Sequence, residues 1–445
     1  MSSQVARRRI DEDGTGPRYL TRGREKGVGM ATVVLVGTLD TKGEEYAWLR
    51  ERLREYGSDV LLVDTGVLPP PAHAPVPDVT ADVVARAAGH DLARLRTEAD
   101  RGAAVAAMAQ GLSRVVLDLY RKGKLHAVLA AAGSGGSAIA AQAMRALPIG
   151  VPKVLVSTMA GGDVSPYVDS SDLTMMYSVV DISGLNTVSR QVLGNAAAAA
   201  AGMARRHERN HDEQAGRGRP VVAATMFGVT TPAVDAARAR LAELGYEVLV
   251  FHATGAGGRA VEKLARDGVL DGVLDLTTTE LADELVGGVL SAGPARLTAA
   301  GAMGIPQVVA PGALDMVNFG PAATVPERFT GRRLLIHNAT VTLMRTTTGE
   351  MAELGTTMGR KLRAARGPAE VFWPLRGISA VDTTGGPFDD PEADRAGLDA
   401  LRAAVRGGEV RVHELDAHVN DASFAVAMAD RLHRLIADGT HGPGH

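Results

Sequence analysis

The chain has no cysteine among its 445 residues. This absence excludes disulfides, thiolate nucleophiles, and zinc or iron–sulfur sites that depend on cysteine. Net charge is also small, because 48 Lys and Arg stand against 51 Asp and Glu to give a formal charge of −3. Such a balance provides no general positive field for a phosphate polymer or an acidic membrane. We therefore expect neither nucleic acid nor a membrane as a partner.

Long hydrophobic runs are missing as well. Apolar runs such as Val33–Val36 and Val128–Ala132 have the length of strands, whereas a membrane span needs about 20 apolar residues. Residues 1–29 carry Arg7, Arg8 and Arg9 without an apolar stretch behind them, so they lack the centre of a secretion signal. We predict a disordered tail over 1–29 and a cytoplasmic protein, with Met30 as an alternative start.

The remaining pattern is typical of an α/β protein. Val33–Val36 predicts a strand, Glu44–Tyr56 a helix and Val60–Asp64 a second strand, which together form a βαβ unit. A second unit is predicted from strands at 127–133 and 153–157 around a helix over 137–147. Uniformly apolar strands that alternate with helices indicate parallel sheets covered on both faces.

The second half of the chain repeats the first. Val221–Met226 aligns with Val33–Thr38, and 243–250 aligns with 55–62 at the same offset. The polar stretch 204–219 has no apolar periodicity and is predicted as a linker. We therefore expect two Rossmann-like modules of similar topology, 30–203 and 220–436, followed by a tail at 437–445. The predicted site is a cleft between the two modules, lined by the loops at the strand ends.

Glycine-rich and hydroxyl-rich loops predict a phosphate site in the first module. Gly133, Ser134, Gly135, Gly136 and Ser137 stand between an apolar strand and an Ala-rich helix, where backbone amides can approach an anion. A tight turn without a ligand is the structural alternative. The other candidate cofactor-binding residues follow the first and fourth strands: Gly37, Thr38, Asp40, Thr41, Lys42, Ser157, Thr158 and Met159.

The sequence indicates a phosphate site in these loops more clearly than it indicates which ligand they bind. Asp40 and Asp163 are candidate Mg²⁺ ligands, although a helix cap explains Asp40 equally well. Gly133, Gly135 and Ala138 satisfy a relaxed dinucleotide fingerprint, but the next strand ends at Ser157 and Thr158 where an acidic ribose ligand is expected. NAD is thus the weaker alternative, and the chain has no P-loop sequence of the ATPase type.

The second module carries different chemistry at its predicted strand ends. Histidine and arginine supply proton transfer and anion binding, so the catalytic candidates are His252, Arg259, His337 and Arg345. The substrate-binding candidates are Thr278, Glu280, Asp315, Asn318 and Arg376. For Thr278 and Glu280 a helix-capping arrangement is the alternative, and a lone histidine is more often structural.

Several long motifs resemble one family. They are Gly133–Ser137, Val156–Ala160, Asp163–Tyr167, Thr225–Pro232, Phe251–Gly255, Pro311–Gly320 and Glu414–Asp421. They resemble a family of largely uncharacterised bacterial and fungal proteins whose best-known relative is the N-terminal, inhibitory domain of the tomato mosaic virus resistance protein. The resemblance runs from about Met30 to Leu435. It implies two Rossmann-like subdomains, ATP with Mg²⁺ and a homodimer, while the TIM-barrel region of the plant protein is absent and could be supplied by a separate partner chain.

These observations support two hypotheses. In the first, the protein is an ATP-using enzyme that acts on a small anionic metabolite, with Lys42 stabilising charge. In the second, it is a nucleotide-binding switch or inhibitory protein that docks a partner protein without catalysis. A nicotinamide-dependent oxidoreductase is a third alternative.

Overall fold

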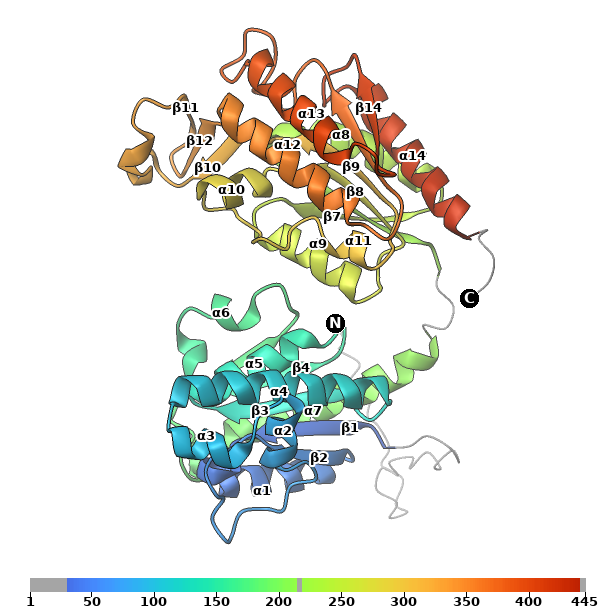
Figure 1. The fold of residues 1–445 in the computed structure, drawn as a ribbon. Helices are drawn as coiled ribbons and strands as arrows, with labels where there is room; N and C mark the ends of the chain where they lie inside the picture. The colour runs from blue at the N-terminus through green and yellow to red at the C-terminus, as the bar shows by residue number, and fades with distance from the viewer. Residues whose placement is uncertain (1–29, 214–217, 441–445) are drawn as a thin grey trace, which may run out of the picture. The chain divides into compact units, whose positions relative to one another are not determined.

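A computed structural model describes residues 30–213 and 218–440, and each of its two α/β modules is described by itself (Figure 1). The first module contains a five-stranded parallel sheet in the order β2-β1-β3-β4-β5. Its strands are β1 (Thr32–Gly37), β2 (Asp59–Asp64), β3 (Ala127–Ala132), β4 (Lys153–Ser157) and β5 (Thr174–Tyr177). This order changes direction between β1 and β3, and such switch points are where open α/β sheets bind ligands.

Helices cover both faces of this sheet. They are α1 (Leu39–Glu55), α2 (Ala81–Ala87), α3 (Leu92–Glu98), α4 (Arg101–Arg121), α5 (Ser134–Ala146), α6 (Ser165–Val168) and α7 (Thr187–Glu213). Val33 and Leu35 of β1 belong to the core with α1 and α7, whereas Val34 and Val36 belong to the core with α2, α4 and α5. Successive side chains of a strand point to opposite faces, so a wholly apolar strand is the expected sequence for a sheet covered twice.

Two predicted loops are the first turns of helices. The segment after β1 is helical from Leu39, with a kink at Lys42, although the sequence predicts a helix only from Glu44. Asp64 of the neighbouring strand accepts from the Leu39 N–H at 3.1 Å and so caps this helix from a distance in sequence. Likewise α5 begins at Ser134 rather than Ser137. Local sequence does not reveal a cap that another strand supplies.

Helix α4 is long and apolar enough to cross a membrane by length and composition alone, and it is the one such helix among the described residues. It packs against α2 and α5, and Met108, Leu112 and Val116 on its buried side join the core. Gly111 allows the close crossing, because a Cβ there would stand 1.9 Å from the Val84 carbonyl oxygen. These contacts are those of a core helix.

The second module repeats the strand order of the first. Its six-stranded parallel sheet has the order β14-β13-β9-β8-β6-β7, so β6, β7, β8 and β9 correspond to β1, β2, β3 and β4. The strands are β6 (Val221–Met226), β7 (Glu247–His252), β8 (Gly272–Thr277), β9 (Gln307–Gly312), β13 (Ala369–Pro374) and β14 (Arg411–Leu415). The prediction of two Rossmann-like modules of the same topology is confirmed.

The helices of this module are α8 (Thr231–Glu243), α9 (Ala256–Arg266), α10 (Glu280–Val286), α11 (Ala299–Ala302), α12 (Thr348–Arg363), α13 (Pro391–Val405) and α14 (Ala422–Thr440). A small antiparallel sheet is an addition that the sequence pattern does not predict. It has the order β10-β12-β11, with strands β10 (Met316–Phe319), β11 (Leu334–Asn338) and β12 (Val341–Arg345). Strands this short leave too few residues for a clear alternation.

The predicted linker is partly helical, because α7 continues to Glu213. Residues 204–213 lack apolar periodicity, yet Ala204 is still fully buried and the later residues extend a helix that tertiary packing has already nucleated. Residues 214–217 and the predicted tails at 1–29 and 441–445 lie outside the described residues. The segment 437–440, predicted as tail, belongs to α14. The predicted cleft between the modules stays a prediction.

Candidate functional site

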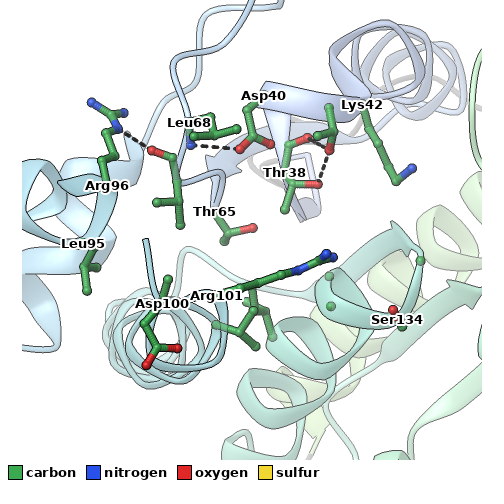
Figure 2. A pocket seen from close by; sticks show the side chains of 18 of the residues that line it. Thr38, Asp40, Lys42, Thr65, Leu68, Leu95, Arg96, Asp100, Arg101 and Ser134 are labelled. Carbon is green, nitrogen blue, oxygen red and sulfur yellow. Dashed lines mark hydrogen bonds between the residues drawn. The ribbon is translucent and has the colours of Figure 1, made fainter. Parts of the chain in front are cut away.

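A cavity of about 670 Å³ lies at the carboxyl ends of β1 and β3, which is the switch point of the first sheet. We call it the β1–β3 cavity (Figure 2). Eight of the predicted cofactor-binding residues line it: Thr38, Asp40, Thr41, Lys42, Gly133, Ser134, Gly135 and Gly136. Two loops that are about 95 residues apart in the sequence thus meet in one cavity. Its volume falls within the range of small-molecule sites, about 300–1,000 Å³.

The β1 side of the cavity presents hydroxyls and an ammonium group. Thr38 Oγ1 and Thr41 Oγ1 lie 3.1 Å apart and are exposed. Lys42 donates from Nζ to the Ile182 carbonyl oxygen, which holds the ammonium at this edge. Asp40 accepts from the Leu68 N–H at 3.0 Å through Oδ2 (Figure 2). Asp40 therefore fixes the segment after β2 and does not cap α1, whose N-cap residue is Thr38.

The β3 side presents the start of α5. Gly133 is the N-cap and supplies no side-chain cap, so the first amides of this 13-residue helix have no side-chain acceptor among the residues that the structure describes. Gly135 borders open space, because a Cβ there would meet nothing closer than Arg101 Nη2 at 3.8 Å. Amides and the partial positive charge of a helix start favour an anion at this position.

Four further polar residues of the cavity escape the sequence analysis, namely Thr65, Arg96, Asp100 and Arg101. Arg101, the first residue of α4, extends across the cavity between Thr38 and Ser134 (Figure 2). Within the described part of the chain its guanidinium has no hydrogen bond or ion pair. Thr65 directly follows β2, so the strand-end rule could have found it, whereas Arg101 begins a helix and no strand-end signal marks it.

The other predicted cofactor residues lie outside the cavity lining. A Cβ at Gly37 would stand 1.8 Å from the Tyr46 ring, so this glycine makes room for a tyrosine whose hydroxyl donates to the strand backbone. Ser137 and Ser157 are fully buried and share a hydrogen bond of 2.7 Å. Thr158 and Met159 belong to the 3₁₀ turn that follows β4. These residues shape the strand ends instead of lining the cavity.

The structure separates the two predicted Mg²⁺ ligands. Asp40 lines the β1–β3 cavity, but Asp163 accepts from the Ser165 N–H at 2.9 Å in the loop after β4. No group of three or more His, Asp or Glu residues in the described ranges, 30–213 and 218–440, is arranged to hold a metal ion. A metal at this cavity would therefore need a ligand's own oxygens to complete its coordination.

The dinucleotide fingerprint is also misplaced for NAD. In a Rossmann site the glycine motif follows the first strand, whereas Gly133 follows β3. The motif Gly133, Gly135 and Ala138 is therefore better explained by the open start of α5.

The four catalytic candidates of the second module lie on separate elements. His252 ends β7 and is exposed, and Arg259 of α9 donates to the Ser291 carbonyl oxygen at 3.2 Å. His337 is exposed on β11, beside an irregularity in the pairing with β12. Arg345 at the end of β12 is 3% exposed. His337 does not end a strand of the parallel sheet, because β11 belongs to the small antiparallel sheet, whereas Arg345 at the end of β12 contacts Asp394 of α13.

Thr278 and Glu280 are fully buried and take part in an internal network. Thr278 donates to the Ala310 carbonyl oxygen at 3.0 Å. Glu280 accepts from the N–H groups of Gly255 and Gly258 and pairs with Arg296 Nε at 2.6 Å. These contacts stabilise the end of β8, so neither side chain is free to bind a substrate as predicted.

Arg296 is the centre of this network and was not found from the sequence. It is fully buried and binds Asp275 through Nη1 and Nη2 at 2.5 and 2.7 Å. Glu262 lies 3.9 Å from Nη1. Where the first module has an open helix start after β3, the second has a closed ion network after β8.

Asp315 and Asn318 are also fully buried. Asn318 donates to Asp283 Oδ2 at 2.7 Å and to Thr279 Oγ1 at 3.2 Å, which indicates a structural role. Asp315 accepts from Ser379 Oγ at 2.7 Å, but its Oδ1 has no hydrogen-bond partner in the described structure. Arg376 is exposed and contacts Asp416 and Asp421.

Three carboxyl groups surround one guanidinium in this module: Asp315 and Asp382 are buried, and Asp394 is largely buried. Asp394 Oδ1 lies 2.7 Å from Arg345 Nη2 and Asp382 Oδ1 lies 3.9 Å from it. Burial, and then the charge of Asp382, raise the pKa of Asp394 to about 8. The same causes raise the pKa of Asp315 to about 7. One guanidinium does not compensate three carboxylates, so Asp394 and Asp315 retain protons near neutral pH.

This group predicts a loss of stability as the pH rises. The native state holds protons that an unfolded chain releases near pH 4, so the free energy of unfolding is expected to fall by at least about 1 kcal/mol between pH 5 and pH 8. Asp394→Asn imitates the protonated carboxyl group and should make this fall smaller. Thermal unfolding across this pH range measures the stability of the wild-type protein and of the variant. An equal or steeper fall in the variant would contradict the assignment to Asp394.

Comparison with known proteins gives the same two-part division. Residues 31–209 match the N-terminal domain and residues 219–436 the C-terminal domain of the Uncharacterised protein family (UPF0261). A UPF0261 protein of Clostridium tetani is 49% identical over 405 residues, covering 91% of this chain and 98% of that protein. UPF0261 protein RA0729 of Rhizobium meliloti is 46% identical, covering 92% of this chain and all of that protein.

A plant relative matches most of this chain. The ToMV resistance protein Tm-1(GCR237) of Solanum lycopersicum is 41% identical over 424 residues, which cover 92% of this chain but 56% of the tomato protein. The matched ranges agree with the two sheets, and they include every residue that lines the β1–β3 cavity. The chain belongs to the UPF0261 family and contains both of its domains.

Proposed function

We propose that the first module binds a nucleotide in the β1–β3 cavity, with ATP as the expected ligand. The observation that carries this proposal is the meeting of the open α5 start with Thr38, Thr41, Lys42 and Arg101 around one cavity. Each of these groups can donate a hydrogen bond, and two of them carry a positive charge. Such a set favours a polyanion over a neutral ligand.

The apolar part of the cavity wall suits the rest of a nucleotide. It is formed by the side chains Val67, Leu68, Leu95, Ala104, Val105 and Ile139. A flat heterocyclic base gains from contact with apolar surface, whereas inorganic phosphate alone would leave this wall unused. The combination of a donor-rich end and an apolar wall supports a nucleotide as the ligand class.

Mg²⁺ fits this site only together with the ligand. Asp40 is the member of the predicted pair that lines the cavity, and its Oδ1 has no hydrogen-bond partner among the described residues. Mg²⁺ is commonly held by one or two carboxylates, with phosphate oxygens and water completing the octahedron. Asp40 would supply the protein ligand, and the metal would neutralise phosphate charge.

Isothermal titration tests the proposal with ATP, ADP, adenosine and tripolyphosphate, each with and without Mg²⁺. We expect ATP to bind more tightly than adenosine or tripolyphosphate. Arg101→Met should weaken ATP binding at least about tenfold, because hydrogen bonds to charged groups contribute roughly 1.5–3 kcal/mol. Arg94→Met is the matched control, since Arg94 is exposed on α3 and pairs with Glu98. No heat from any adenine nucleotide, with or without Mg²⁺, would refute the proposal.

Turnover distinguishes the two functional hypotheses. An ATP-using enzyme releases ADP or AMP when a small anionic metabolite is supplied, and the release should require Lys42. A nucleotide-binding switch holds ATP without turnover and changes its affinity for a protein partner. The homodimer, the separate TIM-barrel partner chain and the cytoplasmic location stay predictions of the family resemblance and of the sequence.

A further inference from the structure

A second cavity, of about 410 Å³, lies at the carboxyl end of β13. We call it the β13 cavity. Its charged lining residues are Arg376, Asp382, Asp389, Asp394 and Arg395, and Trp373 and Leu398 contribute apolar surface. It occupies the edge of the sheet at which parallel α/β proteins bind ligands. Nothing in the proposed nucleotide site uses these residues.

The inner wall of this cavity carries an excess of carboxylate. Asp382 is 2% exposed, and its Oδ2 accepts from the Ile378 N–H at 2.9 Å. Its Oδ1 receives no N–H within hydrogen-bond distance from the described residues, since Arg345 Nη2 stands 3.9 Å away. Asp394 lies beside it with a side chain 16% exposed. Behind them, Asp315 Oδ1 is buried without a partner.

Arg345 cannot supply the missing positive charge to all three carboxyl groups. It is committed to the Phe388 carbonyl oxygen, to Thr346 Oγ1 and to Asp394 Oδ1, at 2.9, 2.9 and 2.7 Å. Removing carboxylates from water is costly unless an opposite charge or a proton compensates them. A cation that enters the cavity would provide this compensation.

The cavity also carries positive charge, on Arg376 and Arg395. Arg376 donates to the Asp416 carbonyl oxygen at 2.8 Å and lies 3.3 Å from the Asp416 carboxylate and 3.4 Å from that of Asp421, while its side chain is 58% exposed. Arg395 reaches Asp399 at 4.0 Å, with a side chain 60% exposed. Guanidinium groups in such positions bind carboxylate, sulfonate or phosphate groups in two-point fashion.

We propose that the β13 cavity is a ligand site for a small zwitterion, with an ammonium group on Asp382 and Asp394 and an anionic group on Arg376 and Arg395. A protonated amine would displace the proton that Asp394 retains near neutral pH, and that proton would pass to the solvent. Binding is thus expected to release protons near neutral pH. The groups that face the pair are Arg345 from β12, Asp315 from the turn before β10, and the cavity's own Arg376, Asp389 and Arg395.

Titration calorimetry of the full chain tests this site with unbranched ω-amino acids of increasing length, and with the alkylammonium ion and alkanoate of each length. At least one ω-amino acid should bind about tenfold more tightly than either single-charge analogue. Repeating the titration in buffers of different ionisation enthalpy should reveal proton release. No binding across the series, or equal binding of the alkanoate, would overturn the proposal.

Two variants connect binding to these side chains. Asp394→Asn keeps the shape of the protonated carboxyl group, so it should fold and should lose about tenfold or more in affinity. Arg395→Met tests the anionic arm from an exposed position that folding does not require. Asp235→Asn is the control, because Asp235 is exposed on α8 and lies 3.8 Å from Arg238. Unchanged affinity in both test variants would refute the site, whereas ATP binding should be the same in all three chains.

Discussion

Arg296→Met is expected to lower the free energy of unfolding of the second module by about 3–5 kcal/mol. Methionine keeps most of the volume of the arginine but leaves Asp275 and Glu280 buried without their cation. The loss of one partner from a buried ion pair is costly because the remaining charge stays out of water. Urea unfolding measures the change, and linear extrapolation gives the free energy.

The two tryptophans of the chain make this experiment specific. Trp373 is buried in the core of the second module, whereas Trp48 belongs to the first. In a Trp48→Phe background, fluorescence therefore reports unfolding around Trp373. Arg238→Met on α8 of the same module is the control, since the pair of Arg238 with Asp235 is exposed and such pairs contribute about 0–1 kcal/mol. A loss in Arg296→Met no larger than in the control would contradict the assigned role of the network.

Gly135→Leu is expected to abolish nucleotide binding without loss of stability. A Cβ at this position would stand beside Arg101 and Val105 at ordinary contact distance, so the backbone there accepts a side chain. Leucine also favours a helix more than glycine does, by roughly 0.8–1 kcal/mol. The side chain would fill space in front of the α5 start, and we expect ATP affinity to fall at least about a hundredfold. Calorimetry measures the affinity and thermal unfolding the stability.

Gly202→Leu is the matched control for this substitution. Gly202 lies in α7, away from the β1–β3 cavity, and a Cβ there would meet only Arg205 Nη2 at 4.0 Å. Both variants gain the same helix-favouring side chain. A difference in ATP affinity between them therefore reports the effect of filling the cavity. ATP affinity in Gly135→Leu that stays within about twofold of the control would place the ligand elsewhere.

The glycine positions show how far local sequence reasoning reaches. Gly133–Ser137 is recognisable as a phosphate loop because glycines follow an apolar strand, and the structure brings four of these residues to the cavity. Gly37 stands in a similar position in the sequence but exists for the Tyr46 ring. The two glycine patterns look the same in the sequence. What requires a glycine at each position is the atom that approaches it, and that atom belongs to another element of the fold.

Charged residues of the second module show more clearly what local sequence reasoning cannot predict. Glu280 follows a strand and three threonines, which is the pattern of a ligand-binding edge or of a helix cap. Arg296, 16 residues later, forms a buried ion pair with the Glu280 carboxylate, so this carboxylate is structural and does not bind a ligand. Arg345 and Arg376 look equally suited to a substrate in the sequence, yet one is 3% exposed and the other lines a cavity. Burial depends on packing between distant segments, which no local spacing records.

The sequence by itself determined the two parallel sheets, their repeated topology and the edge at which ligands are expected, because strand-length apolar runs and the duplication are local and periodic. Only the tertiary structure decided which polar residues at that edge are free to act. It joined Arg101 to the α5 start, enclosed Glu280 and Arg296 in the interior, and gathered Asp315, Asp382 and Asp394 around Arg345. The physical reason is that exposure, pairing and proton affinity are properties of the surroundings of a side chain, and those surroundings come from residues far away in the chain.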